Sequence, residues 1–463
     1  MIPMKASEIA SIVSGDYSGP VDLVIDGEFR FDSRSIRPGE VFLALPGAKF
    51  DGHDFVDAAF AAGATLALTT KPVSGPHIRV QNVIEALSRL ASEMRNRLKE
   101  LKVVAITGSQ GKTTTKDILG TVVLARVGET VIPENSYNND LGVPLTLLRC
   151  TTSTRFCVVE MGARHGGDIA RLTTIAQPEV GVVLRVGTAH LGEFGSREVI
   201  AKTKGELIRG LRDSATAVLG MYDEFTPKMA EGMKVRRLTF GEVAGSDVRA
   251  ADVEIKGGFA SFELVTPEGR EPVELQILGE HQISNALAAA AVAFALKIPT
   301  PQIAASLSAH KSGSKWRMEL HDLGEILLVN DSYNANPESM TAALRTLALL
   351  SQERGGNSWA FIGKMHELGV DSELFHKQIG KLAGELGIDH LVSIGVPEYI
   401  EGIEGTNTSG HLFADIQSAT QILNRLSGAD VVLVKASRAE GLEEIAERII
   451  SIWSVPGTGG VER

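Results

Sequence analysis

The sequence LKVVAITGSQGKTTTKDIL, residues 101–119, decides how we interpret this chain. An apolar run rich in β-branched residues, 101–107, leads into the glycine loop Gly108-Ser-Gln-Gly111, and helix-forming residues follow it. The order predicts a strand, a tight loop and the N-terminus of a helix. Backbone N–H groups and the helix dipole converge at such a point, so we expect an anion site there.

The residues after Gly111 indicate that the anion bound at this site is a nucleotide phosphate. Lys112 would bring a positive charge to the β- and γ-phosphates, and the hydroxyl of Thr113 can ligate Mg²⁺. The spacing departs from the standard P-loop, which would place its first glycine at Ile106. A bare glycine turn is the alternative, but it does not explain why Lys-Thr-Thr follows Gly111 directly.

Length and composition set the class of protein. A chain of 463 residues predicts roughly three domains. The net charge of −11 argues against nonspecific binding of nucleic acid or of an anionic membrane surface. No apolar run is long enough to insert in a membrane, and the first residues lack the layout of a signal peptide. Cys150 and Cys157 have no metal-site spacing, so we expect a reduced cytoplasmic protein in which they pack as small apolar side chains.

Residues 1–97 are predicted to form a small α/β domain with two polar clusters. Arg34, beside Ser33, could hold a diphosphate, since a guanidinium binds one through two parallel hydrogen bonds. The second cluster is the loop from Gly47 to His53. Taken alone, its Asp51-Gly-His sequence is more simply a turn that caps the next helix.

Residues 98–310 begin with the glycine loop and then alternate strands and helices. The apolar runs 156–161 and 180–186 do not alternate with polar residues, which is typical of a parallel sheet covered on both faces. Glu160 and His190 stand at the carboxyl ends of these strands, as the glycine loop does, so we expect both near the nucleotide as Mg²⁺ ligands. Each alone could instead be structural, Glu160 as a helix cap and His190 as a loop histidine.

Two further segments of this region stay ambiguous from pattern alone. The loop around Asn138 and Asn139 is dense in amides, which bind substrate hydroxyls or carboxylates but are also common in ordinary loops. Residues 201–206 are predicted to open a helix, and a solvated face is the plain structural interpretation of its Lys202 and Lys204.

Residues 311–463 are predicted to form a second doubly wound sheet that lacks a P-loop. Its first strand, 325–329, leads into Asn330-Asp-Ser-Tyr-Asn-Ala-Asn336 and a helix over 338–350. Two α/β lobes, only one of which carries phosphate-binding residues, suggest a cleft that closes on the substrate.

Seven ordered motifs resemble the Mur ligases of peptidoglycan synthesis and span nearly the whole chain. They are TGSQGKTTTKDIL, ENSYNNDLGVPLTLL, EMGARHGGDIARL, VGTAHLGEFGS, GEHQISNALAAA, NDSYNANPESM and KASRAEGLEEI. The resemblance implies an α/β protein of three domains: a UDP-binding domain, a central ATPase-type parallel sheet and a C-terminal Rossmann-like domain. It also implies an ATP- and Mg²⁺-dependent amide ligase, a cytoplasmic monomer, that adds D-alanyl-D-alanine to UDP-N-acetylmuramoyl-tripeptide through an acyl phosphate.

The same resemblance assigns roles by position. Those implied for ATP are Gly108, Gly111, Lys112, Thr113, Thr114, Asn285, Arg317 and Asp331. Those implied for metal are Thr113, Glu160 and His190, and the catalytic group is Lys112, His190 and Lys204. Lys204 matches a lysine that is carbamylated in several relatives, with Lys202 as the nearby competitor. Those implied for the UDP-linked substrate and the opposite wall of the cleft are Ser33, Arg34, Gly47, Asp51, His53, Asn138, Asn139, Tyr333, Asn334 and Asn336.

Several positions depart from the family pattern. Arg185 stands where asparagine is usual, and Thr188 stands where proline is common. Gln282 replaces the asparagine that usually follows the residue at His281. None removes a group that the chemistry requires. Another ligase of the same superfamily is one rival interpretation, and a P-loop switch or motor protein that hydrolyses ATP without forming an amide is the other.

Overall fold

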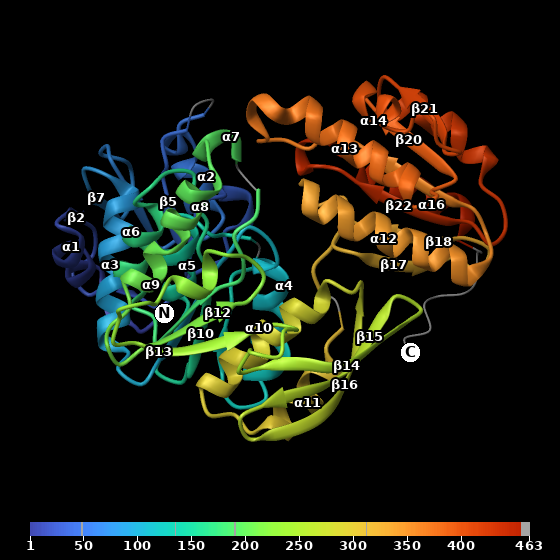
Figure 1. Ribbon diagram of the computed structural model, residues 1–463. Coiled ribbons are helices and arrows are strands. Elements are labelled where there is room, and N and C mark those ends of the chain that lie inside the picture. The colour runs from blue at the N-terminus through green and yellow to red at the C-terminus, as the bar shows by residue number, and fades with distance from the viewer. Residues whose placement is uncertain (48–49, 135, 189–190, 312, 455–463) are drawn as a thin grey trace.

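The computed structural model describes residues 1–47, 50–134, 136–188, 191–311 and 313–454, and Figure 1 shows them as three lobes in chain order. The first lobe is blue, the second runs from cyan to yellow, and the third is orange to red. The α/β class expected from the sequence is confirmed. None of the described helices has both the length and the apolarity to cross a membrane.

The first lobe is a five-stranded sheet in the order β2-β7-β6-β5-β4, with a two-stranded sheet of β1 and β3 beside it. Asn82 begins its longest helix, because its side-chain oxygen accepts hydrogen bonds from the N–H groups of Ile84 and Glu85. The elements are β1 (Met4–Lys5), α1 (Ala6–Val13), β2 (Asp16–Ser18), β3 (Val24–Ile25), β4 (Phe29–Arg30), η1 (Ser33–Ser35), β5 (Val41–Leu43), η2 (Gly52–Phe55), α2 (Val56–Ala61), β6 (Leu66–Thr69), β7 (His77–Arg79) and α3 (Val83–Arg97).

The second lobe is built on a six-stranded parallel sheet in the order β13-β12-β11-β8-β10-β9. Its middle strands are buried on both faces, as their unbroken apolar runs predicted. The elements are β8 (Lys102–Thr107), α4 (Lys112–Asp117), the wider-turned π-helix η3 (Ile118–Leu124), β9 (Thr130–Val131), α5 (Gly142–Leu148), β10 (Phe156–Glu160), α6 (Asp168–Ala176), β11 (Val180–Val183), α7 (Leu191–Phe194), α8 (Arg197–Lys204), α9 (Glu206–Arg209), β12 (Thr216–Gly220), η4 (Thr226–Lys228) and β13 (Arg236–Phe240).

One prediction for this lobe is wrong. The helix expected to open at residue 201 begins at Arg197, where Ser196 accepts a hydrogen bond from Val199 N, and it ends at Lys204. The segment 201–206 therefore joins the end of α8 to the start of α9. The expected solvated face does not form either, because only Lys202 is exposed and Lys204 is buried.

An antiparallel sheet and two helices complete the second lobe. Alanine-rich α10 lies almost wholly in the core, because its small side chains let it pack closely on the central sheet. Figure 1 shows this sheet and α10 below the central sheet, on the side that approaches the third lobe. The elements are β14 (Arg249–Lys256), β15 (Phe259–Thr266), β16 (Gly269–Leu278), α10 (Gln282–Ala295) and α11 (Thr300–Ala309).

The third lobe is a six-stranded sheet in the order β17-β18-β22-β19-β20-β21, parallel except for β17. Its first long helix, α12, begins with Asn336 and Ser339 capping each other's backbone and ends before Gly355, whose φ of +76° suits glycine. The elements are β17 (Glu319–Asp322), β18 (Leu327–Asn330), α12 (Pro337–Arg354), β19 (Ser358–Ile362), η5 (Gly369–Asp371), α13 (Ser372–Glu385), β20 (His390–Ile394), α14 (Pro397–Gly402), β21 (Ser409–Phe413), α15 (Ile416–Ala419), η6 (Thr420–Arg425), β22 (Val431–Lys435), η7 (Arg438–Glu440) and α16 (Glu443–Trp453).

The hydrophobic cores tie the first two lobes together. A single cluster contains Leu90 of α3, Val103 of β8 and Leu147 of α5, so the first lobe packs directly on the central sheet. The third lobe has separate clusters on the two faces of its sheet, one of which also includes Leu278 of β16 in the second lobe. The first and second lobes should therefore move as one unit, and relative motion belongs to the third lobe.

Candidate active site

The glycine loop joins β8 to α4 at the carboxyl edge of the central sheet. Gly111 has a φ of +79°, a left-handed conformation that glycine adopts without strain, and α4 begins at the next residue, Lys112. The Nζ atom of Lys112 donates a 2.8 Å hydrogen bond to the carbonyl of Gly108. The ammonium group therefore lies folded across the loop, where the N-terminus of α4 also favours negative charge.

Glu160 and Thr113 meet beside this loop. Glu160 ends β10, which pairs with β8, and its Oε2 accepts a 3.4 Å hydrogen bond from the Thr113 hydroxyl. Its Oε1 atom is buried and has no hydrogen-bond partner among the described residues. A buried carboxylate oxygen without a donor, next to a hydroxyl, is a set of oxygen ligands that suits a hard divalent cation. His190, predicted to ligate the same metal site, lies outside the described residues.

The charges at this point perturb one another. Burial lowers the pKa of Lys112, and the carboxylate of Glu160 opposes that shift. Burial likewise raises the pKa of Glu160, against the opposing charges of Lys112, Lys116 and Arg317. Both ionised groups are thus poorly solvated, and a ligand that brings phosphate oxygens and a metal ion would supply the missing partners.

Lys204 is a second buried amine near the loop. It is the last residue of α8, its side chain is buried, and burial together with the charge of Lys112 holds its pKa well below the usual range. Lys202, the competing lysine, is exposed on the same helix. Of these two lysines, Lys204 is the one whose environment disfavours the charged amine.

The third lobe contributes Arg317 to the opposite side of the site. Its guanidinium lies 3.9 Å from the centre of the Tyr333 ring, a cation–π contact. The same group donates a 3.2 Å hydrogen bond to the hydroxyl of Ser136, which in turn lies 3.1 Å from the hydroxyl of Thr113. Arg317 is thereby linked across the two lobes to the first turn of α4.

Asp331, predicted to contact the nucleotide, is held by Lys435. The Nζ atom of Lys435 lies 2.5 Å from Oδ2 of Asp331 and 2.8 Å from the carbonyl of Asn334. The other carboxylate oxygen of Asp331 accepts a 3.1 Å hydrogen bond from Met318 N. Next to this pair, burial lowers the pKa of His281 to about 4, against the opposing effect of Asp331.

Asn285 packs directly on the glycine loop. A β-carbon added to Gly111 would lie 2.2 Å from its Oδ1 atom, so the loop and the side chain are in close contact. Its Nδ2 atom donates a 2.8 Å hydrogen bond to Oε1 of Gln282, one turn earlier on α10. Gln282, which departs from the family pattern, therefore orients Asn285.

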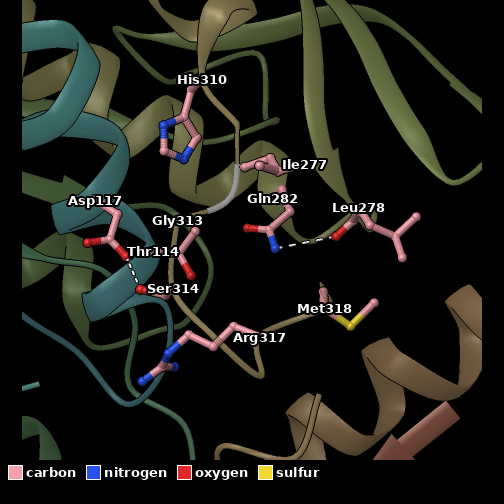
Figure 2. A pocket seen from close by; sticks show the side chains of 10 residues that line it. All are labelled: Thr114, Asp117, Ile277, Leu278, Gln282, His310, Gly313, Ser314, Arg317 and Met318. Atoms are coloured by element: carbon pink, nitrogen blue, oxygen red, sulfur yellow. Dashed lines mark hydrogen bonds between the residues drawn. The ribbon is translucent and has the colours of Figure 1, made fainter. Parts of the chain in front are cut away.

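Gln282 and Arg317 also line a pocket where the second and third lobes meet. Figure 2 shows Thr114 and Asp117 on one wall, Gln282 on another, and Arg317 with Met318 on the segment that leads into the third lobe. Asp117 accepts a hydrogen bond from the Ser314 hydroxyl, which ties α4 to that segment. A neighbouring cavity of about 580 Å³ extends past Thr113 and Arg317 toward Arg149.

The predicted residues of the first lobe lie apart from this pocket. Ser33 and Arg34 form the exposed turn η1, and both guanidinium donors of Arg34 that face Asp32 are bound to it, at 2.9 and 2.7 Å. That ion pair lowers the pKa of Asp32. To bind a diphosphate, Arg34 would have to break its hydrogen bonds to Asp32 or use its remaining donors.

Within the second cluster of the first lobe, residues 51–53 form a turn, and residues 48–49 lie outside the described residues. Asp51 accepts a hydrogen bond from His53 N and begins η2, so the simpler interpretation of this sequence as a helix cap is confirmed. Nε2 of His53 accepts a 2.9 Å bond from Thr70 N, so its Nδ1 carries the proton and donates to Asp51, 2.5 Å away. Lys71 holds the same carboxylate and lowers its pKa. Gly47 is described as the start of this loop, where its N–H binds the carbonyl of Phe50.

The amide residues divide into two groups. Oδ1 of Asn139 accepts hydrogen bonds from Leu141 N and Gly142 N, and so begins α5. Asn336 likewise caps α12. Asn138 contacts Gly162 just beyond β10, and Asn334 is exposed, with Oδ1 bound to the N–H of the next residue. The oxygens of Asn139 and Asn336 are therefore committed to the backbone.

Sequence reasoning missed three residues of this region: Ser136, Lys435 and Glu338. Ser136 is one hydroxyl in an amide-rich loop, and nothing in its pattern distinguishes it. Lys435 carried a signal, because a lysine that ends an apolar strand must be buried or paired. Glu338 accepts hydrogen bonds from the N–H and hydroxyl of Thr188 in the second lobe, a contact that no local pattern predicts.

Comparison with known families and proteins agrees with this arrangement. Residues 106–293 match the Mur ligase middle domain, residues 316–438 the Mur ligase glutamate ligase domain, and residues 29–150 the catalytic domain of the Mur ligase family. The UDP-N-acetylmuramoyl-tripeptide–D-alanyl-D-alanine ligase of Mycobacterium bovis is 39% identical over 97% of this chain and 98% of its own. The ligase of the same name from Escherichia coli is 35% identical over 97% of this chain and 99% of its own.

Solved structures show the same similarity over more than nine-tenths of the chain. A crystal structure of MurF from Acinetobacter baumannii superposes with a TM-score of 0.88 at 34% identity, covering 97% of this chain and 99% of the other. MurF from Thermotoga maritima, crystallised in complex with ADP, gives a TM-score of 0.79 at 30% identity over 92% of this chain and 98% of the other. The chain belongs to the Mur ligase family.

Proposed function

We propose that this protein is an ATP-dependent ligase that joins D-alanyl-D-alanine to UDP-N-acetylmuramoyl-tripeptide in peptidoglycan precursor synthesis. The observation that carries the proposal is the meeting of Lys112, Thr113 and Glu160 with Arg317 of the third lobe, in a chain similar over nearly its full length to ligases of this activity. A phosphate loop opposed by an arginine from another lobe suits phosphoryl transfer between two enclosed substrates.

The reaction follows from the weakness of a carboxylate as an electrophile. The terminal carboxylate of the tripeptide attacks the γ-phosphorus of ATP, which forms an acyl phosphate and releases ADP. The amino group of D-alanyl-D-alanine, after losing a proton, then attacks the acyl carbon, and inorganic phosphate leaves as the amide forms. Lys112 and Arg317 would stabilise the charge on the transferring phosphoryl group, where most of the catalysis is electrostatic.

Thr113 and Glu160 would hold the Mg²⁺ of the bound nucleotide, with His190 as a further ligand. The unpartnered Oε1 atom of Glu160 supports this assignment, because a buried carboxylate oxygen requires a partner. The ion would neutralise phosphate charge. Lys204 would be the carbamylated lysine of this enzyme, since only an unprotonated amine reacts with CO₂ and burial lowers the pKa of this amine.

Roles proposed for the remaining residues follow their positions. Gly108, Gly111, Thr114 and Asn285 would surround the nucleotide phosphates, and Asp331 would approach the nucleotide from the third lobe. The first lobe would hold the UDP end of the substrate near its exposed turns. One chain supplies all of these groups, and ATP and UDP-linked sugars are cytoplasmic metabolites, so we place the enzyme in the cytoplasm as a monomer.

A phosphate-release assay tests the function. ADP and phosphate should form only when both a UDP-linked muramoyl tripeptide and D-alanyl-D-alanine are present with ATP and Mg²⁺. Equal ATP hydrolysis without them would overturn the proposal and favour a P-loop switch. A panel of tripeptides that differ in the third residue would identify the diamino acid that the enzyme accepts.

A further inference from the structure

A single carboxylate of the third lobe binds the second lobe close to the phosphate loop. Glu338 lies in the first turn of α12, and its Oε1 accepts hydrogen bonds from Thr188 N at 2.8 Å and from the Thr188 hydroxyl at 2.9 Å. Thr188 follows β11 of the central sheet, so both bonds cross between lobes. Two donors on one ionised acceptor make this a charge-assisted contact.

The contact continues into the phosphate loop through Gly187. Its N–H donates a 2.9 Å hydrogen bond to the hydroxyl of Ser109, the second residue of the loop. Ser109 N in turn donates to the carbonyl of Arg185 at 3.0 Å. Glu338, Thr188, Gly187 and Ser109 thus form a continuous chain from the third lobe to the residues that surround Lys112.

Gly187 is a glycine because two groups approach its backbone, not because of its φ angle. A β-carbon there would lie 2.8 Å from Oε1 of Glu338 and 3.3 Å from Cβ of Ser109. The backbone of Gly187 therefore lies directly between the carboxylate of Glu338 and Ser109 of the phosphate loop. A shift of α12 must move this segment or break its hydrogen bonds.

The third lobe touches the second again a few residues further on. Gly192 N donates a 3.2 Å hydrogen bond to the carbonyl of Glu367, and Gly369 packs against the backbone of Gly192. The third lobe therefore contacts the central lobe on both sides of residues 189–190.

Thr188 makes this contact possible in this chain. Proline, common at the corresponding position of the family, has neither a backbone N–H nor a hydroxyl and could offer Glu338 no donor. Within the described residues, Oε2 of Glu338 is buried and unpartnered, so Oε1 makes all of its hydrogen bonds. Without the donors of Thr188, the carboxylate would lie unsatisfied between the lobes, which is costly.

We propose that Glu338 is a positioning residue, which fixes the phosphate loop through Thr188 and Gly187 when the third lobe docks on the central lobe. The proposal rests on the proposed function, in which Arg317 must meet the nucleotide held by Lys112. Loss of the contact should lower kcat, because the positioning of the phosphate loop in the docked enzyme depends on it. The KM for ATP should stay nearly unchanged, because the loop that binds ATP is intact before the lobes dock.

The test compares Glu338→Gln, Thr188→Val and the double variant with the unchanged full-length enzyme. Each single change should reduce kcat roughly 10- to 100-fold, the size expected for a lost hydrogen bond to a charged group, with the KM for ATP within about threefold. The double variant should lose less than the two single losses combined, since Thr188→Val removes one donor of the contact and Glu338→Gln removes the charge of its acceptor. Thr188→Ser keeps both donors and should retain activity.

Glu353→Gln is the matched control. It removes the same charge from the same helix, and its carboxylate binds the N–H of Gly257 at 3.2 Å, on the sheet of β14–β16 rather than at the phosphate loop. Its kcat should match that of the unchanged enzyme. A loss as large as that of Glu338→Gln would mean that charge on α12, rather than the Thr188 contact, matters, and would overturn the proposal.

A second measurement is independent of activity. Spin labels at Val243→Cys and Leu412→Cys, both exposed positions, report the distance between the second and third lobes. With a non-hydrolysable ATP analogue, the distance distribution should be narrow in the labelled parent and in Glu353→Gln, and broad in Glu338→Gln and Thr188→Val. Unchanged kcat and unchanged distances in both variants would refute the proposal. An enzyme with no dipeptide-dependent ADP release would refute the proposed function instead, and the distances would still decide the role of Glu338.

Discussion

The ammonium of Lys435 lies 2.5 Å from the carboxylate of Asp331, and the two residues stand at the ends of neighbouring strands, β22 and β18. Lys435 is 2% exposed and Asp331 13% exposed at the side chain, so the pair is almost free of water. The same ammonium binds the carbonyl of Asn334, and so fixes the turn that follows β18. The turn after β18, at the edge where Asp331 is proposed to approach the nucleotide, is thus organised by an internal ion pair.

Lys435→Met should destabilise the protein strongly. It leaves the carboxylate of Asp331 buried without a counter-charge, and breaking one partner of a buried pair costs about 3 kcal/mol or more. Urea unfolding, followed by circular dichroism, measures the free energy of unfolding. Lys381→Met, at an exposed lysine that pairs with Glu385 on the surface, should change it by less than about 0.5 kcal/mol. Equal effects of the two changes would contradict the role given to the buried pair.

Lys112→Ala should abolish ligation while the protein stays folded. The variant removes the positive charge that lies across the glycine loop, and losses of about a thousandfold are typical when one group that stabilises transition-state charge is deleted. Steady-state ADP release gives the rate, and the thermal unfolding midpoint checks the fold. Lys102→Ala, at the exposed start of β8, is the control and should keep full activity. Near-normal turnover of Lys112→Ala would refute the assignment of the phosphate site.

The sequence predicted those parts of the fold that depend on local pattern. The apolar runs at β8, β10 and β19 identified buried parallel strands. The sequence also placed the glycine loop correctly between a strand and a helix, because these three parts are contiguous in the chain. Contacts between lobes could not be predicted this way. Ser136, Lys435 and Glu338 act on residues far away in sequence, so their partners follow only from how the lobes pack.

The error at α8 has a similar cause. Residues 201–206 contain lysines and a glutamate, which by composition suggest the exposed start of a helix. Ser196 begins the helix earlier, and the burial of Lys204 against the central lobe overrides its usual preference for water. Burial of a lysine is costly, because it disfavours the charged form of the amine. Lys204 therefore stands out in the structure, where its burial is visible, and not in the sequence.

His281 should make the protein less stable in acid. Burial lowers its pKa from 6.5 to about 4, so between these values the unfolded chain binds a proton that the folded protein does not. Its stabilising effect is complete above pH 6.5 and is lost as the pH falls toward 4. The loss amounts to at most about 3 kcal/mol, since the ring keeps part of its surface exposed.

His281→Asn isolates this contribution. The free energy of unfolding, measured by urea titration at pH 7 and pH 4, should fall less between the two pH values in the variant than in the unchanged protein. His165→Asn, at an exposed histidine of the second lobe, should leave the difference unchanged. An identical pH dependence in His281→Asn and the parent would show that the ring is protonated as easily in the folded protein as in the unfolded chain.

Gly111→Ala should impair the phosphate loop in two ways that can be separated. The φ of +79° costs a residue with a side chain about 1–2 kcal/mol, and the new methyl group would lie 2.2 Å from Oδ1 of Asn285. Asn285→Ala removes the steric clash with the new methyl group but not the backbone strain at residue 111. If both matter, the KM for ATP should rise in Gly111→Ala, and the double variant should recover part of the lost unfolding free energy relative to the sum of the single changes. Simple additivity of the two changes in unfolding free energy would show that the loop moves away from α10 at no cost, and that Asn285 does not support it.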